Sequence, residues 1–370
     1  MYEGPVIDPD VHHTWKSEDW IIDHLSPRWR EFARASGRGH VPLAAPGAHW
    51  PHFQGANKRL DTFPADGSPP GADYETMKRQ LLDPFHIERA ILSFDIGTNP
   101  GVPNADFAID LCRAINDWNV EYWLGMGDPR LYSAIMVPTQ TPEAAAKEIR
   151  RVARRSSHIA EVLLVYNGLG KPFGHPAYDP IYAAAVEVGL PIAIHGGGEI
   201  TYGTAKPMAG GIVNSRLELH TLSPQPTLHH LVSYITHGTF EKFPTLKLML
   251  IELGVAWIPW LMWSLDAQYR ILRAESPWVK RLPSESFREH VRVATQPCEF
   301  PDEPQRLIEL LQCFDGIEDL LCFCTDYAHW DEDDPAYVGR RFPEAWWPKL
   351  FWDNAAWVYG FDRPGAAKAG

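Results

Sequence analysis

Short apolar runs alternate with longer segments of helical periodicity along most of the chain. The runs consist mainly of valine, isoleucine, leucine and alanine, which is typical of strands that are buried on both faces of a parallel sheet. The segments between them place apolar residues three or four positions apart, which indicates helices with one buried face. The runs predicted to be strands are 6–13, 89–94, 131–137, 159–165, 191–195, 246–252, 291–294 and 320–325.

Helices are predicted in the intervals between these strands. Asn104 can cap a helix over 104–121, in which apolar residues recur at helical spacing, and Thr141 followed by Pro142 starts another. The other predicted helices are 74–85, 180–188, 227–240, 255–274, 303–314 and 343–359. This alternation predicts an α/β fold, a distorted (β/α)8 TIM barrel, that forms one domain over residues 1–370.

Two long insertions interrupt the alternation directly after strand ends. The first, at about 14–73, is rich in proline and holds one short predicted helix at 26–34, whereas the second, at about 196–224, is rich in glycine. Loops that follow the strands of such a barrel lie at its C-terminal face, and long loops are usually functional. We therefore expect both insertions over that face. For the first insertion, an oligomer contact or a disordered flap is an alternative of equal weight to a functional loop.

Composition and charge narrow the range of partners. A formal charge of −13 disfavours nucleic acid and anionic membranes, because both require clustered lysine and arginine. Five cysteines, an odd number found mostly in apolar runs, indicate reduced core residues and no disulfide framework. The sequence shows no leader pattern and no run approaching about 18 apolar residues, so we expect a soluble cytoplasmic protein.

Side chains of the metal-ligand type stand where three predicted strands end. The first strand carries Asp10 and His12, two positions apart and hence on one face. The fifth strand ends in His195, and the eighth ends in Asp326. Because the active site of a (β/α)8 barrel lies at the C-terminal ends of its strands, we expect these side chains to meet. Two carboxylates and two imidazoles are suitable ligands for a divalent metal ion.

These residues resemble the pattern of the amidohydrolase superfamily, in the amidohydrolase-2 branch related to aminocarboxymuconate-semialdehyde decarboxylase and the aromatic-acid decarboxylases. The likeness consists of the acid-x-His pair on strand one, the histidine ending strand five and the aspartate ending strand eight. Phe240–Lys247 matches a further family stretch. The likeness covers nearly the whole chain in the right order, and it implies a metal-dependent enzyme built on a barrel.

The chain departs from this family pattern at the end of strand six. Many relatives have a histidine followed by glycine there, whereas this chain has Glu252. We expect Glu252 to transfer protons, with metal ligation as a close alternative. Three carboxylates with two imidazoles favour manganese or iron, with zinc still suitable, and they leave room for one ion or two. Asp326 and His329, which follows it on the same loop, are the other candidate catalytic residues, although a surface position suits His329 equally well.

Three functions fit these residues. The first is a metal-dependent hydrolase that acts on a small cyclic or aromatic substrate through metal-activated water. The alternative is a non-oxidative decarboxylase, a carbon–carbon lyase, of an aromatic or unsaturated carboxylic acid. The third is a metal-binding scaffold without catalysis, against which the complete ligand set argues. The 15 tryptophans suggest a flat substrate bound by stacking, and we expect a homo-oligomer, in the simplest case a dimer.

Overall fold

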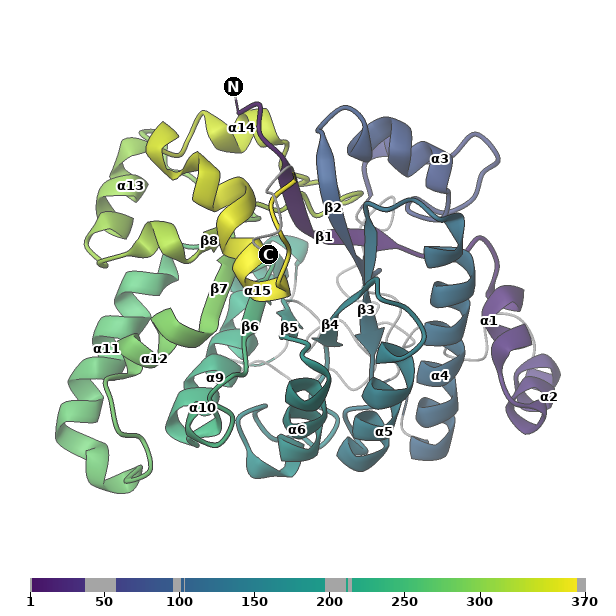
Figure 1. Ribbon diagram of the computed structural model, residues 1–370, viewed down its shortest axis with the longest axis horizontal. Coiled ribbons are helices and arrows are strands. Elements are labelled where there is room, and N and C mark those ends of the chain that lie inside the picture. Colours follow the sequence, from purple (N-terminus) through teal and green to yellow (C-terminus); the bar gives the residue numbers. More distant parts are fainter. Residues whose placement is uncertain are drawn as a thin grey trace, which may run out of the picture.

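The centre of the computed structural model is one sheet of eight parallel strands, in which each strand pairs with the next along the chain (Figure 1). The structure describes residues 2–36, 58–95, 101–102, 104–196, 211 and 215–364. The predicted (β/α)8 barrel is therefore confirmed. The strands are β1 (Val6–His13), β2 (Ile87–Phe94), β3 (Leu131–Met136), β4 (Ile159–Leu164), β5 (Ile192–His195), β6 (Leu248–Ile251), β7 (Val291–Ala294) and β8 (Leu321–Cys322).

The barrel closes where β1 meets the segment that follows β8. Val11 and Tyr327 form a parallel bridge, and the N–H of His12 donates to the carbonyl of Tyr327 at 2.7 Å. The carboxylate of Asp8 fixes the same seam, because it accepts bonds from the N–H of Thr325 at 3.1 Å and from its hydroxyl at 2.6 Å. This seam brings the ligand candidates of strands one and eight together.

Helices cover the outside of the barrel and pack on its apolar core (Figure 1). Two predicted starts are confirmed: the side chain of Asn104 accepts a bond from the N–H of Phe107 at 3.0 Å, and Pro142 begins α5. The helices are α1 (Glu18–His24), α2 (Pro27–Ser36), α3 (Tyr74–Met77), α4 (Ala105–Tyr122), α5 (Pro142–Ala153), α6 (Asp179–Val188), α8 (Arg216–Leu222), α9 (Pro224–Thr236), α10 (Thr239–Lys242), α11 (Trp257–Leu272), α12 (Pro283–His290), α13 (Gln305–Gln312), α14 (Pro335–Gly339) and α15 (Asn354–Tyr359).

The C-terminal segment differs from its prediction. A continuous helix over 343–359 was expected, but the chain forms a 3-10 turn at Glu344–Trp346 and a π-helical turn at Lys349–Asp353 before α15. Pro348 lies between the two turns and has no N–H to continue a helical ladder. Strand eight is also shorter than the predicted 320–325. The N–H of Phe323, the first residue after β8, donates to the carbonyl of Leu350 and not to a neighbouring strand.

The described parts of both insertions reach the segment after β8. Residues 37–57 of the first insertion and 197–210 and 212–214 of the second lie outside the described residues. Where the first insertion resumes, Lys58 forms an antiparallel bridge with His329. In α8 of the second insertion, His220 lies 3.0 Å from a carboxylate oxygen of Asp331. Both contacts are at the C-terminal face of the barrel, as predicted.

The cysteines and the apolar content agree with the expected core. Four of the five cysteines are buried, the fifth is Cys313, and all five are free thiols. In the part of the chain that the structure describes, none of the helices has both the length and the apolar character that crossing a membrane requires.

The seam between β1 and β8 yields a prediction about stability. Asp8→Ala leaves two buried donors of Thr325 without an acceptor, which should lower the free energy of unfolding by about 3 kcal/mol. Urea titration followed by circular dichroism measures the change. Asp302→Ala, which removes an exposed carboxylate, is the matched control and should unfold like the wild type. Equal midpoints for the wild type and Asp8→Ala would show that Asp8 does not secure the barrel.

Candidate metal centre

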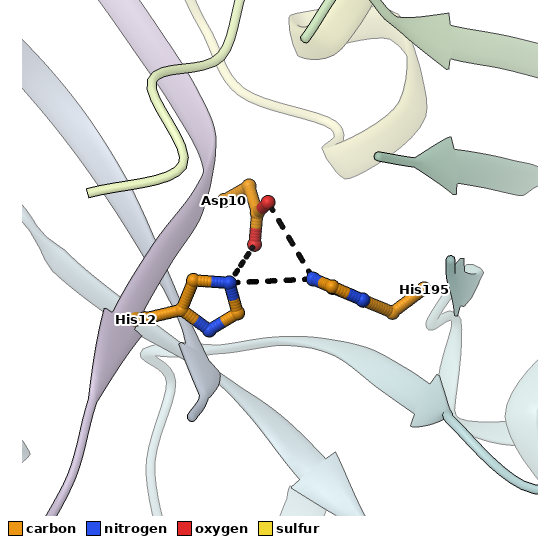
Figure 2. Close-up of side chains that lie close together, drawn as sticks. All are labelled: Asp10, His12 and His195. Atoms are coloured by element: carbon orange, nitrogen blue, oxygen red, sulfur yellow. Dashed lines mark hydrogen bonds and ion pairs between the residues drawn. The ribbon is translucent and has the colours of Figure 1, made fainter. Parts of the chain in front are cut away.

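Asp10 and His12 of β1 and His195 of β5 form a triangle in the mouth of the barrel (Figure 2). The Nε2 atoms of His12 and His195 lie 3.3 Å apart. Oδ1 of Asp10 lies 3.7 Å from Nε2 of His12, and Oδ2 of Asp10 lies 3.6 Å from Nε2 of His195. All three side chains are buried. The fold therefore brings these three predicted ligands together, with ligand atoms close enough to hold one ion.

Asp326 and His329 join the triangle from the segment after β8. Oδ1 of Asp326 lies 2.9 Å from Nε2 of His12 and 2.5 Å from Nδ1 of His329. These three residues form a second group that could hold a metal ion, and His12 belongs to both groups. Asp326 and His329 are both buried, so the alternative of a surface position for His329 is wrong.

Backbone carbonyls fix the tautomers of the two central imidazoles. Nδ1 of His12 lies 3.1 Å from the carbonyl oxygen of Phe94, and Nδ1 of His195 lies 2.7 Å from that of Gly196. Because a carbonyl oxygen only accepts hydrogen bonds, each Nδ1 carries the hydrogen of the neutral ring. Each Nε2 then directs a lone pair toward the other and toward Asp10. Such lone pairs and carboxylates repel one another unless a cation lies among them.

The carboxylates at the centre are held by neighbours but are not fully satisfied by them. The hydroxyl of Ser93 donates to Oδ1 of Asp10, whereas the buried Oδ2 of Asp10 has no hydrogen-bond partner among the described residues. The amide of Gln296 donates to Oδ2 of Asp326 at 3.0 Å, which leaves Oδ1 facing His12. A buried carboxylate oxygen without a donor is unfavourable, and a metal ion would satisfy it. The residues present therefore fit a divalent ion.

Protons take the place of the cation in the metal-free protein. Burial alone would lower the pKa of His195, but the carboxylates of Asp10 and Glu252 raise it to about 10. Burial raises the pKa of Asp326 well above its ordinary value, although His12 opposes the change. Burial also lowers the pKa of His12. Near neutral pH the metal-free centre therefore holds a proton on His195, which a metal ion must displace, and burial favours the protonated form of Asp326.

Glu252 lies just past the end of β6 in a strained backbone conformation. Its φ is 59° and that of Asp326 is 62°, in a region that residues other than glycine rarely adopt. Strain of this kind clusters at functional sites. Oε2 of Glu252 lies 3.4 Å from Nδ1 of His195, the ring nitrogen that does not face Asp10. Burial raises the pKa of Glu252 despite the opposing charge of His195.

The surroundings include four residues that the sequence did not single out as functional. Ser93 and Gln296 orient the two central carboxylates, as described above. Nζ of Lys58 lies 2.7 Å from Oδ2 of Asp95, beside the bridge that Lys58 forms with His329. Their positions in the sequence could have indicated a role at the site. Ser93 and Asp95 stand at the end of strand two, and Gln296 follows strand seven.

The comparison with protein families agrees with this geometry. A family model described as Amidohydrolase matches residues 7–361, from β1 to beyond α15. The chain belongs to the amidohydrolase family. The resemblance inferred from the strand-end residues is therefore confirmed over nearly the whole chain.

Curated relatives of this amidohydrolase-family chain are decarboxylases by name. The γ-resorcylate decarboxylase of Rhodococcus jostii strain RHA1 is 25% identical over 307 residues, which cover 79% of this chain and 89% of that protein. The decarboxylase orsB of Emericella nidulans is 28% identical over 164 residues, which cover 42% of this chain and 46% of that protein.

Solved structures share the fold across nearly the whole chain. An amidohydrolase from Mycobacterium avium subsp. paratuberculosis K-10 has a TM-score of 0.70 and 21% identity, covering 98% of this chain and 99% of its own. A 5-carboxyvanillate decarboxylase from Novosphingobium aromaticivorans, solved with manganese and a nitrobenzoic acid, has a TM-score of 0.69 and 20% identity, covering 96% of each chain.

The central triangle predicts which substitutions release the metal. Asp10→Ala and His195→Ala each remove one donor, and both variants should lose most of the bound metal and the activity. Elemental analysis of the purified proteins measures the metal content. His229→Ala, which removes an exposed histidine of α9, is the control and should keep the wild-type content. Wild-type metal content in both central variants would refute the assignment.

The pKa of His195 predicts that metal binding releases protons. Because this pKa is about 10 in the metal-free protein, His195 is protonated at pH 7.5 and must lose its proton to donate a lone pair. Metal affinity should therefore rise with pH up to about pH 10. Calorimetric titration with manganese, repeated in buffers of different ionisation enthalpy, should show release of at least one proton per ion. Binding without proton release, or affinity that does not change between pH 6 and 8, would contradict this protonation state.

Proposed function

We propose that this member of the amidohydrolase family is a metal-dependent, non-oxidative decarboxylase of a hydroxylated aromatic carboxylic acid. The observation that carries the proposal is the buried cluster of Asp10, His12, His195 and Asp326 in a chain whose curated relatives are decarboxylases by name. Three of the related solved structures contain manganese, and their bound molecules are nitro-substituted phenols. Manganese is therefore the ion that we propose for this chain.

The four clustered residues would hold the ion, and their neighbours keep them in place. When bound, a divalent ion supplies a Lewis acid for the carboxylate and hydroxyl oxygens of an aromatic acid. Ser93 and Gln296 donate hydrogen bonds to the two carboxylate ligands and so fix their orientation. Nζ of Lys58, beside His329, is paired with the carboxylate of Asp95 at 2.7 Å, so these two residues together add no net charge at this mouth.

Glu252 is the residue that we propose as the proton donor. Its burial favours the protonated carboxyl form, and the strained turn after β6 directs it to the His195 side of the centre. In the proposed step its proton adds to the ring carbon that bears the carboxylate. The bond between that carbon and the carboxylate then breaks, its electron pair returns to the ring, and CO2 leaves. Uptake of a proton from water restores Glu252.

Hydrolysis through an activated water, the first function expected from the sequence, has less support. A hydrolase needs a group that removes a proton from water, so its carboxylate must be ionised near neutral pH. Burial raises the pKa of Glu252, which disfavours the ionised form that such a base requires. The names of the curated relatives point in the same direction.

The reaction is tested with the manganese-loaded protein and a panel of 2-hydroxy- and 2,6-dihydroxybenzoates in D2O. We expect one CO2 for each molecule of phenol formed, with deuterium on the carbon that lost the carboxylate. Metal-free protein is the control and should release no CO2. Turnover that incorporates oxygen from labelled water without releasing CO2 would identify a hydrolase and contradict the proposal.

Substitution of Glu252 tests its proposed role. Glu252→Gln keeps the size of the side chain but removes the transferable proton, so it should keep the metal and lower kcat by about 100-fold or more. Elemental analysis and steady-state kinetics on the same preparation measure both quantities. Loss of metal would make Glu252 a ligand, and unchanged turnover would remove it from the mechanism.

A further inference from the structure

The outer face of α11 carries a stripe of exposed apolar side chains. Trp260, Trp263 and Ile271 are 61%, 47% and 76% exposed, and Ala267 and Ala274 are exposed on the same side. The spacings of three and four residues place them along one line of the helix and its last turn. We call these five residues the α11 stripe. In Figure 1, α11 lies at the outer left edge of the molecule, away from the strands.

The size of this stripe is that of the largest apolar patch on a typical protein surface, about 300–600 Å². The two tryptophans and the isoleucine expose on the order of 400 Å², given the 150–250 Å² that a single buried aromatic side chain covers. An apolar patch of this size often marks a contact surface. A stable dimer needs about 800 Å² from each partner, of which about 65% is apolar in homodimers. The stripe with its two alanines therefore supplies most of the apolar area that one such interface requires.

We propose that a second copy of this chain covers the α11 stripe. The chain has a formal charge of −13, so two copies repel each other, and they can approach closely only where acidic side chains are absent. The stripe itself contains no charged residue. The proposal is independent of the reaction at the metal centre.

The order of large and small residues along the stripe favours one arrangement of the two helices. Ala267 lies at the middle and allows two helices to approach closely. If a two-fold axis passes beside Ala267 with the helices antiparallel, Trp263 packs on the partner's Ile271 and Trp260 packs on the partner's Ala274. A parallel arrangement would place each tryptophan against its own copy and each alanine against its own copy. The antiparallel arrangement also sets the two helix dipoles in opposite directions.

The two-fold arrangement is tested by the mass of the protein in solution, measured by light scattering after size exclusion. The wild type should be at least a dimer. Trp263→Lys and Ile271→Glu should each halve the mass, because each variant places two charges in the apolar contact. An equimolar mixture of the two variants should regain the wild-type mass, since one half of the contact is then native and the other is a lysine–glutamate pair.

Controls separate this contact from unfolding and from other surfaces. Leu310→Glu places a charge on an exposed leucine of α13 and should leave the mass unchanged. Circular dichroism spectra should be equal for all variants, because the substituted side chains are exposed, whereas the monomeric variants should melt at a lower temperature because they lose the stabilisation from association. A monomeric wild type, or variants that keep the wild-type mass, would overturn the proposal. A mixture that fails to regain the mass would overturn the antiparallel arrangement.

Discussion

Two imidazole nitrogens and two carboxylates share one small buried space at the mouth of this barrel, and their lone pairs and negative charge must be balanced by a metal ion or by protons. The Nε2 atoms of His12 and His195 face each other at 3.3 Å because backbone carbonyls hold both Nδ1 hydrogens. Asp10 and Asp326 add negative charge to the same space. The parallel seam between β1 and the segment after β8 holds Asp10 and His12 next to Asp326. The same contacts therefore close the barrel and bring the candidate ligands together.

The charge of the centre also determines what the neighbouring groups can do. His195 takes up a proton when no metal is present, which compensates for part of the missing positive charge, and burial favours the protonated form of Asp326. Glu252 is buried beside His195 but on the other ring nitrogen, where burial favours its protonated form. A carboxyl group that holds a proton near a Lewis acid suits protonation of an aromatic ring better than activation of water. Glu252 is the residue at which the chain departs from the family pattern on strand six. Its tendency toward the protonated form therefore favours the proposed lyase reaction over hydrolysis.

Sequence patterns predicted the fold and pointed to the candidate ligands because strands and the residues at their ends can be read from local periodicity. Apolar runs located all eight strands, and the ends of three of them located Asp10, His195 and Asp326. The broken C-terminal helix was missed because prolines and turns interrupt a segment whose apolar residues still recur at helical spacing. Ser93 and Gln296 were not identified as functional, since a polar residue at a strand end does not reveal its distant partner. The buried position of His329 likewise depends on the tertiary path of the first insertion.

The position of the cation is the most direct test of these conclusions. Crystals of the manganese-loaded protein, measured on both sides of the manganese absorption edge, give an anomalous difference map that locates the ion without assumptions about the protein. We predict one strong peak at about 2.2 Å from Nε2 of His12, Nε2 of His195 and one oxygen each of Asp10 and Asp326. No peak at this place, or a peak bound by other residues, would contradict the proposed centre.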